Sequence, residues 1–578
     1  SVFQGLVTVL KDILSRHIEF IYPHSNSSTL VEKICENFDI SPTTENKSER
    51  DYWDENDSFL ITYGDTILSE DKHPLQNIHK FLGDYLEKAI TGVHILPYFP
   101  FTSDDGFAVS DYRAVRADLG DWEDIKDIGE NYRLMSDVVI NHASTSHEWF
   151  KQFLSDENPG RHYIKTSDPS EDHALVTRPR PSPLLIPFQT TAGEKHVWCT
   201  FGADQADLDF SNPDLLCEFI SLMRFYINKG IRVFRLDAVG FLWKENGTNC
   251  LHLPQTHEII KLIRTLVDHL EDTILLITET NVPNHENLQY FGNGNEAHVI
   301  YNFSLPPLLV HALLTGRSTY LRRWMMAMPP SQDGCTLFNF SASHDGIGLR
   351  PVEGLLPEDE IAKMIDTIMG FGGRVTMRSY EGHEVPYEMN TTLFSALKGT
   401  IHGEDNFHVE RFIASQTIMM SLEGIPAFYI QSLLASENDE ARAAQAGHNR
   451  ALNRTQWSGE DIDAAMSDEN SPLFLIFCEL KIRLEIRKKL KAFHPDATQF
   501  TLHLKPGMFG FWRQSLDRKQ SLFVVTNITH EEKLLSLRDM NLYQQAQWKE
   551  LLSNTIVDPS DEVLTLSPYQ SIWITNVS

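Results

Sequence analysis

The chain has 578 residues, too many for one ordinary domain and enough for a large barrel with appended modules. Hydrophobic residues make up 41% and aromatic residues 10%, so a large core can form and disorder is excluded for most of the chain. The formal net charge of -30 repels phosphate backbones and anionic lipid, which argues against nucleic-acid or membrane partners. An anionic substrate would need local arginines to overcome this field.

The compartment follows from three further features of the sequence. Residues 1–15 lack the basic stretch and apolar core of a secretory signal, and no run of about 18 apolar residues predicts a membrane span. The six cysteines are scattered, without a C-x-x-C pair. We therefore predict a cytoplasmic protein with reduced thiols and no metal site.

The hydrophobic pattern changes along the chain. Residues 1–56 carry apolar residues at helical spacing and predict a helical N-terminal extension. Short apolar strands then alternate with longer amphipathic segments. We predict eight strands at 59–63, 92–99, 134–140, 232–239, 274–280, 297–303, 335–340 and 425–430. Eight strands separated by helical stretches predict an α/β fold, a closed (β/α)8 TIM barrel.

Two stretches interrupt this rhythm and a third follows it. Residues 143–200, rich in Pro, Ser and Asp, follow the third strand, and residues 346–400 follow the seventh. Both predict inserted domains on strand-to-helix loops, which form the catalytic face of such a barrel. The barrel then occupies 57–142, 201–345 and 401–494. Short alternating strands in 495–578 predict a C-terminal antiparallel β domain.

Four predicted strands end in polar residues. The third is followed by His142, the fourth carries Arg235 and Asp237, the fifth ends in Glu279, and the seventh is followed by Asp345. Charged groups are costly inside a barrel unless they are paired, so four such ends at one rim predict a shared polar pocket.

Two carboxylates in that pocket could transfer a glycosyl group. Asp237 and Glu279 follow neighbouring strands, which lie about 4.8 Å apart, and a retaining pair requires about 5–5.5 Å. Arg235 lies two residues before Asp237, on the same side of the strand, where it would keep Asp237 ionised. Asp345 would bind sugar hydroxyls and the positive charge that develops at the ring.

These motifs resemble the signature regions of the α-amylase clan of glycoside hydrolases. The blocks at 95–112 (ILPYFPFTSDDGFAVSDY), 140–144 (INHAS), 235–250 (RLDAVGFLWKENGTNC), 301–314 and 343–360 are similar to the sucrose phosphorylase subfamily. Within it, the blocks VTRPRPSPLLIPFQ (176–189), TETNVPNHENLQYFG (278–292) and PYEMN (386–390) most resemble the 2-O-α-glucosylglycerate phosphorylase branch.

The resemblance implies roles for matched residues. Asp237 would be the nucleophile, Glu279 the general acid/base and Asp345 the transition-state stabiliser. The residues implied to bind the substrates are Asp104, Phe107, His142, Arg180, Phe201, Gln205, Arg235, His344, Tyr387 and Arg450. Among these, Arg180 would meet phosphate and Tyr387 would lie on a loop. Taken alone, the motif around Arg180 also fits a stiff, solvated basic loop, and Phe107 also fits a core position.

Two departures from the sucrose phosphorylase pattern bear on the leaving group. Asn281 stands where a histidine is typical, and Val385-Pro386-Tyr387-Glu388 replaces Asp-Leu-Tyr-Gln. Both changes fall where the resemblance places fructose, so they favour glycerate, with Arg178 or Arg180 meeting its carboxylate.

The predicted activity is reversible phosphorolysis of 2-O-α-D-glucosylglycerate by double displacement. The partners would be the glucoside and inorganic phosphate, with no cofactor, and the chain would be a monomer or homodimer. The alternatives are sucrose, sucrose 6'-phosphate or glucosylglycerol phosphorylase, an α-glucosidase, or a silent glucan-binding protein.

Overall fold

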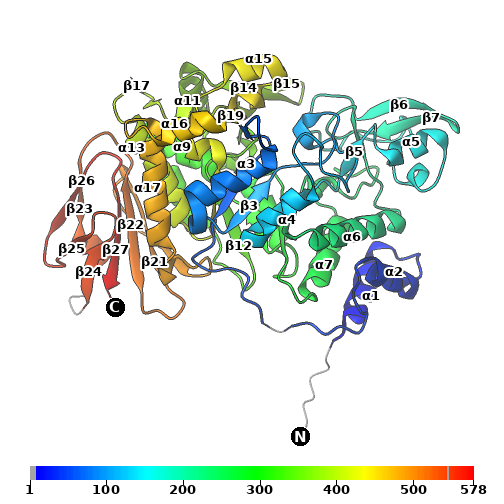
Figure 1. The fold of residues 1–578 in the computed structure, drawn as a ribbon, viewed down its shortest axis with the longest axis horizontal. Coiled ribbons are helices and arrows are strands. Elements are labelled where there is room, and N and C mark those ends of the chain that lie inside the picture. Colours follow the sequence, from blue (N-terminus) through cyan, green and yellow to red (C-terminus); the bar gives the residue numbers. More distant parts are fainter. Residues whose placement is uncertain (1–7, 48, 543–545, 578) are drawn as a thin grey trace, which may run out of the picture.

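The computed structural model describes residues 8–47, 49–542 and 546–577. Its centre is a closed barrel of eight parallel strands, β1-β18-β12-β11-β10-β9-β4-β3 in order around the barrel (Figure 1). These strands are β1 Phe59–Thr62, β3 Gly92–Ile95, β4 Arg133–Val138, β9 Ile231–Leu236, β10 Leu275–Thr278, β11 Val299–Tyr301, β12 Thr336–Phe340 and β18 Ile425–Tyr429. All eight predicted strands are present, and the predicted fold class is confirmed.

Helices cover the barrel from outside and return the chain to the start of each strand. The main ones are α3 Pro74–Phe81, α4 Trp122–Asn131, α6 Pro213–Asn228, α7 Pro254–Asp268, α9 Leu305–Thr315, α13 His408–Ser421 and α17 Pro472–Arg487. Several begin with a polar cap followed by proline. The Asn212 side chain accepts from the Asp214 amide at 3.0 Å, and Ser471 caps α17 in the same way. No helix in the described part of the chain is long and apolar enough to cross a membrane.

The N-terminal segment forms two helices, α1 Leu10–Ile21 and α2 Ser27–Asn37, that pack beneath α6 and α7 (Figure 1). Leu14 and Ile18 of α1 are fully buried. His17 contacts Glu258 of α7 at 2.6 Å, and the Tyr22 hydroxyl donates to the Phe210 carbonyl. Residues 1–7 and 48 of the predicted extension lie outside the described residues.

Two inserted segments lie in the connections that follow β4 and β12. After β4 come β5 His142–Ser144, α5 Glu148–Ser155 and the hairpin β6 Leu185–Thr190 with β7 Gly193–Trp198. After β12 come β13 Ile347–Gly348, α11 Glu358–Gly370 and the hairpin β14 Arg374–Tyr380 with β15 His383–Asn390. In Figure 1 the first hairpin lies at the upper right and the second at the top, away from α1 and α2. The segment boundaries given above stay predictions.

The C-terminal part is an antiparallel six-stranded sheet in the order β20-β21-β22-β27-β24-β25. Its strands are β20 Thr498–Thr501, β21 Met508–Gln514, β22 Ser521–Asn527, β24 Gln547–Glu550, β25 Thr555–Val557 and β27 Ser571–Val577, and a two-stranded ribbon, β23 Lys533–Ser536 with β26 Val563–Leu566, accompanies it. The sheet lies on the α17 side of the barrel (Figure 1), far from the inserted hairpin β6–β7. The residues 543–545 and 578 of this predicted segment lie outside the described part.

Candidate active site

One cleft gathers the predicted site residues at the carboxyl ends of the barrel strands. It is lined by Asp104, Phe107, His142, Arg180, Phe201, Arg235, Asp237, Glu279, His344, Asp345, Tyr387 and Arg450, together with Asn281 and Arg350. Gln205 is the predicted residue that stays behind the wall, where its amide donates to Asp104 at 3.0 Å.

The two central carboxylates stand opposite each other because of the strand register. In the ladder between β9 and β10, Thr278 pairs with Leu236. The next amide, of Glu279, donates to the Leu236 carbonyl at 3.1 Å, so the ladder continues for one more residue. Glu279 therefore faces Asp237 across strands that lie about 4.8 Å apart.

A buried arginine orients Asp237. Arg235 Nη1 donates to Asp237 Oδ1 at 2.8 Å and to Asp137 Oδ1 at 2.5 Å, while Nε donates to the Tyr301 hydroxyl at 3.1 Å. Asp137 also meets His94 Nε2 at 2.7 Å. Since Arg235 occupies Oδ1, Asp237 presents Oδ2 to the cleft with no hydrogen bond from any described residue.

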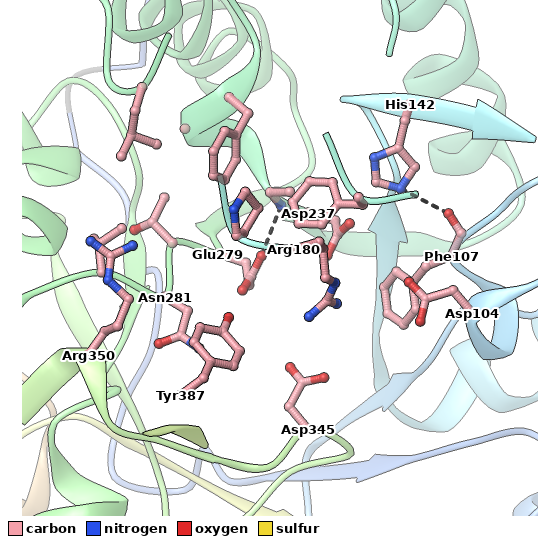
Figure 2. Close-up of a pocket in the computed structure, with 18 of the residues that line it drawn as sticks. Asp104, Phe107, His142, Arg180, Asp237, Glu279, Asn281, Asp345, Arg350 and Tyr387 are labelled. Carbon is pink, nitrogen blue, oxygen red and sulfur yellow. Dashed lines mark hydrogen bonds between the residues drawn. The ribbon is translucent and has the colours of Figure 1, made fainter. Parts of the chain in front are cut away.

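Glu279 is held by a strained turn. The Ala238 amide donates to Glu279 Oε2 at 2.9 Å (Figure 2). Ala238 makes this bond from the left-handed region, with φ 49°, a conformation that costs roughly 1 kcal/mol or more for a residue with a Cβ. Oε1 receives no hydrogen bond from any described residue.

Burial raises the pKa of both central acids, and their hydrogen bonds distinguish them. Burial raises the pKa of Glu279, against the opposing charge of Arg235, and the Asp345 carboxylate raises it further. Burial also raises the pKa of Asp237. Arg235 donates directly to Asp237 and not to Glu279, so this hydrogen bond favours the charged form of Asp237.

Asp345 stays charged in the same site. Its burial would raise its pKa, but His344, 3.4 Å away, and the ion pair with Arg450 Nη1 at 2.9 Å hold that pKa below the ordinary value. Arg450 is fixed in turn by two contacts to Glu388, at 2.8 and 3.0 Å. Burial lowers the pKa of His344 to about 3, so its ring is neutral at physiological pH.

A second group of side chains forms the wall on one side of the carboxylates. Asp104 and Phe107 come from the loop after β3, where the Phe107 ring stacks on His344 at 5.5 Å. His142 Nε2 lies 3.0 Å from the Phe107 carbonyl (Figure 2). Phe201 tilts against His142, with ring centroids 5.2 Å apart. These residues offer an apolar face and a rim of polar groups, which suits a pyranose ring.

The rest of the cleft is lined by Arg180, Arg350 and Tyr387 from the inserted segments and by Asn281 from the loop after β10. Figure 2 shows Asp104, Phe107 and His142 on one side of Glu279, and Asn281 and Arg350 on the other. Arg180 lies over the Phe201 ring, its guanidinium carbon 5.8 Å from the centroid. Tyr387 of β15 points into the same space.

Three sequence expectations need revision at this side. Arg178 does not line the cleft, because its guanidinium donates to the Ser182 carbonyl instead. Glu388, expected at the leaving group, is buried behind the wall in its pair with Arg450. Val385 likewise does not line the cleft. Asn281 does line it, as the sequence interpretation required.

Some functional neighbours were missed in the sequence. Asp137 and Arg235 are register partners in adjacent strands, so aligning the inward-facing positions of β4 and β9 would have paired them. His94 joins them from β3. Arg350 lies within the matched block 343–360, but the spacing gave no sign that it lines the cleft. No cluster of three or more His, Cys, Asp or Glu in the described ranges is arranged to hold a metal ion.

Comparison with known proteins agrees with this geometry. The α-amylase catalytic domain model matches residues 56–339. The chain is 39% identical over 574 residues to the glucosylglycerate phosphorylase of Allomeiothermus silvanus, covering 99% of each. It is 37% identical over 572 residues to the glucosylglycerate phosphorylase of Escherichia coli, covering 98% of this chain and 100% of that one.

A solved structure supports the fold alone. The crystal structure of sucrose 6F-phosphate phosphorylase from Thermoanaerobacter thermosaccharolyticum matches with a TM-score of 0.72 at 23% identity, covering 83% of this chain and 94% of that one. The predicted family is confirmed by the two full-length relatives. The chain belongs to the α-amylase family, in the branch that holds the glucosylglycerate phosphorylases.

Proposed function

We propose that the protein catalyses the reversible phosphorolysis of 2-O-α-D-glucosylglycerate to α-D-glucose 1-phosphate and D-glycerate, with retention at the anomeric carbon. The observation that supports the mechanism is the pair Asp237 and Glu279, which face each other in register, with Arg235 donating to Asp237. The two full-length relatives support the choice of substrate.

In the first displacement, Asp237 Oδ2 attacks the anomeric carbon while Glu279 gives its proton to the glycosidic oxygen. The C1–O bond to glycerate breaks, glycerate leaves with a hydroxyl at C2, and a β-glucosyl ester remains on Asp237. Arg235 holds the attacking carboxylate in place through Oδ1. The charged Asp345, paired with Arg450, stabilises the positive charge that develops at the ring.

In the second displacement, a phosphate oxygen attacks the same carbon from the face that glycerate left. The ester bond breaks, Asp237 recovers its carboxylate, and Glu279 accepts the proton of the incoming phosphate. Two inversions give the α anomer. Arg180, partly exposed above Phe201, is the cation assigned to phosphate on this path.

An acceptor panel tests the proposal. The purified protein is incubated with α-D-glucose 1-phosphate and D-glycerate, glycerol, D-fructose or D-fructose 6-phosphate, and inorganic phosphate is measured over time. We expect the fastest release with glycerate. Faster release with fructose, its phosphate or glycerol would replace the substrate, and equal release without any acceptor would indicate a hydrolase.

A further inference from the structure

The leaving group of the proposed reaction carries a charge that the deep part of the cleft would repel. Asp104, Asp237, Glu279 and Asp345 all contribute carboxyl groups to this cleft. A glycerate carboxylate must therefore meet a cation close to Glu279, the group that protonates its bridging oxygen. The cleft-lining arginines other than the two that pair with Asp237 and Asp345 are Arg180 and Arg350, among the described residues.

Arg350 lies on the side of Glu279 that suits binding of the glycerate carboxylate. Figure 2 shows it beyond Asn281, on the side of Glu279 opposite to Asp104 and His142. A Cβ placed on Gly348, two residues earlier, would stand 3.0 Å from Asn281 Oδ1, so this segment packs directly on the loop after Glu279. A leaving group that extends from Glu279 away from Asp104 and His142 would point towards Arg350.

The Arg350 side chain is mostly buried and has no close ion-pair partner. Its nearest acid, Glu353, lies 4.0 Å from Nε and is closer to Arg378, at 3.2 Å. The Arg350 Nε is buried with no hydrogen-bond partner, and the side chain is only 20% exposed. A buried donor without an acceptor is costly, and an incoming carboxylate removes that cost.

The backbone on both sides of Arg350 is fixed. The Leu349 amide donates to the Tyr387 carbonyl at 3.0 Å, which ties the segment to β15. The Pro351 carbonyl accepts from the Ser304 hydroxyl at 2.9 Å. Anchoring of this kind holds a binding group in its productive position before the ligand arrives.

Asn281 supplies the complementary neutral contact. Its Oδ1 is buried without a hydrogen-bond partner, although the side chain lines the cleft. The free hydroxyl at C3 of glycerate is a donor of the required kind, and the amide could rotate to offer its N–H instead. The subsite thus presents one cation and one amide, matching a carboxylate and a hydroxyl on a short chain.

We propose that Arg350 binds the carboxylate of the leaving group and sets the specificity for a small hydroxy acid, leaving Arg180 to phosphate. This inference rests on the proposed function, because it assigns the glycerate carboxylate. It predicts that loss of Arg350 weakens use of glycerate much more than transfer of the glucosyl group to a phosphate analogue.

The experiment compares two rates from α-D-glucose 1-phosphate, both followed by phosphate release. One depends on glycerate, and the other depends on arsenate, which replaces phosphate as acceptor and gives an ester that hydrolyses in water. In Arg350→Met the ratio of glycerate-dependent to arsenate-dependent kcat/KM should fall about 10- to 100-fold, the range expected for a charge-assisted contact.

Two further variants complete the design. Arg350→Lys keeps the charge but loses the planar guanidinium, so its ratio of glycerate-dependent to arsenate-dependent kcat/KM should fall several-fold. This variant tests the inference if Arg350→Met does not fold. Arg323→Met, an exposed arginine of α10 (Thr319–Ala327), should keep the wild-type ratio. A wild-type ratio in both Arg350 variants, or an equal loss of both rates, would overturn the inference. A wild-type enzyme that performs arsenolysis but ignores glycerate would instead overturn the proposed substrate.

Discussion

The inner and outer halves of the cleft are built in different ways. The inner half, with Asp137, Arg235 and Asp237 at its centre, comes from the ends of barrel strands, and its side chains are buried. The outer half, with Arg180, Arg350 and Tyr387, comes from the inserted segments, and its side chains are partly exposed. Glu279 lies where the two halves meet.

The difference separates chemistry from substrate choice. Strand register fixes the relative positions of the inner acids. Loops fix the outer cations, so a change of loop can change the leaving group while Asp237 and Glu279 keep their positions. The predictions below test whether the two halves respond differently.

The largest effect is expected in the inner half. Asp237→Asn removes the nucleophile and should reduce kcat with glucosylglycerate and phosphate by at least about 10⁴-fold, because no other group can form the glucosyl ester. The exposed Asp359→Asn of α11 is the matched control and should keep normal activity. Near-normal kcat in Asp237→Asn would remove this residue as the nucleophile.

Substitution of Arg180, in the outer half, should change the KM for phosphate. Arg180→Ala should raise the KM for phosphate about 10- to 100-fold, because it removes a charge-assisted contact. Arg178→Ala, two residues away and bonded to the Ser182 carbonyl, should leave that KM near the wild-type value. If the two variants gave the same phosphate dependence, phosphate binding would have to be assigned elsewhere.

Glu279, which lies where the two halves meet, should determine the pH dependence of the reaction. Phosphorolysis needs the protonated form of Glu279, whose pKa is raised by burial and by Asp345, so activity persists above the ordinary range of a glutamate. As pH rises through that raised pKa, kcat/KM for glucosylglycerate should fall up to about tenfold per pH unit. The descending limb should vanish in Glu279→Gln, and its survival there would assign the acid to another group.

The smallest effect is expected at Glu388, which is buried behind the wall of the cleft. Glu388→Gln keeps the shape of the Arg450 partner but removes its charge, so Arg450 holds Asp345 less firmly. A loss of roughly 2- to 10-fold in kcat/KM for glucosylglycerate should follow, with little change in the phosphate KM. The exposed Glu384→Gln of the same hairpin is the control. A larger effect on phosphate than on the glucoside would show that Glu388 serves the outer half.

How much the sequence predicts also differs between the halves. The apolar strands and the polar residues that end them gave the barrel, and they placed Asp237, Glu279 and Asp345 at one rim, because strand periodicity is local. The buried pairing of Asp137 with Arg235 and His94 needed the order of strands as well as their presence.

The loops were predicted less well for a physical reason. The directions of Arg178, Arg350 and Glu388 depend on where the inserted segments pack, and no local pattern encodes this. Arg178 turns to the Ser182 carbonyl, while Arg350 is directed into the cleft by backbone contacts to Tyr387 and Ser304. Tertiary contacts of this kind decide which of several arginines meets the substrate.

The most direct test of retaining phosphorolysis is the product of a single forward reaction. The protein is incubated with 2-O-α-D-glucosylglycerate and inorganic phosphate, and the anomeric signals are followed by NMR from the first turnovers. The paired roles of Asp237 and Glu279 predict α-D-glucose 1-phosphate and glycerate in equal amounts. Accumulation of β-D-glucose 1-phosphate would contradict the double displacement, and free glucose in place of the phosphate ester would contradict phosphorolysis.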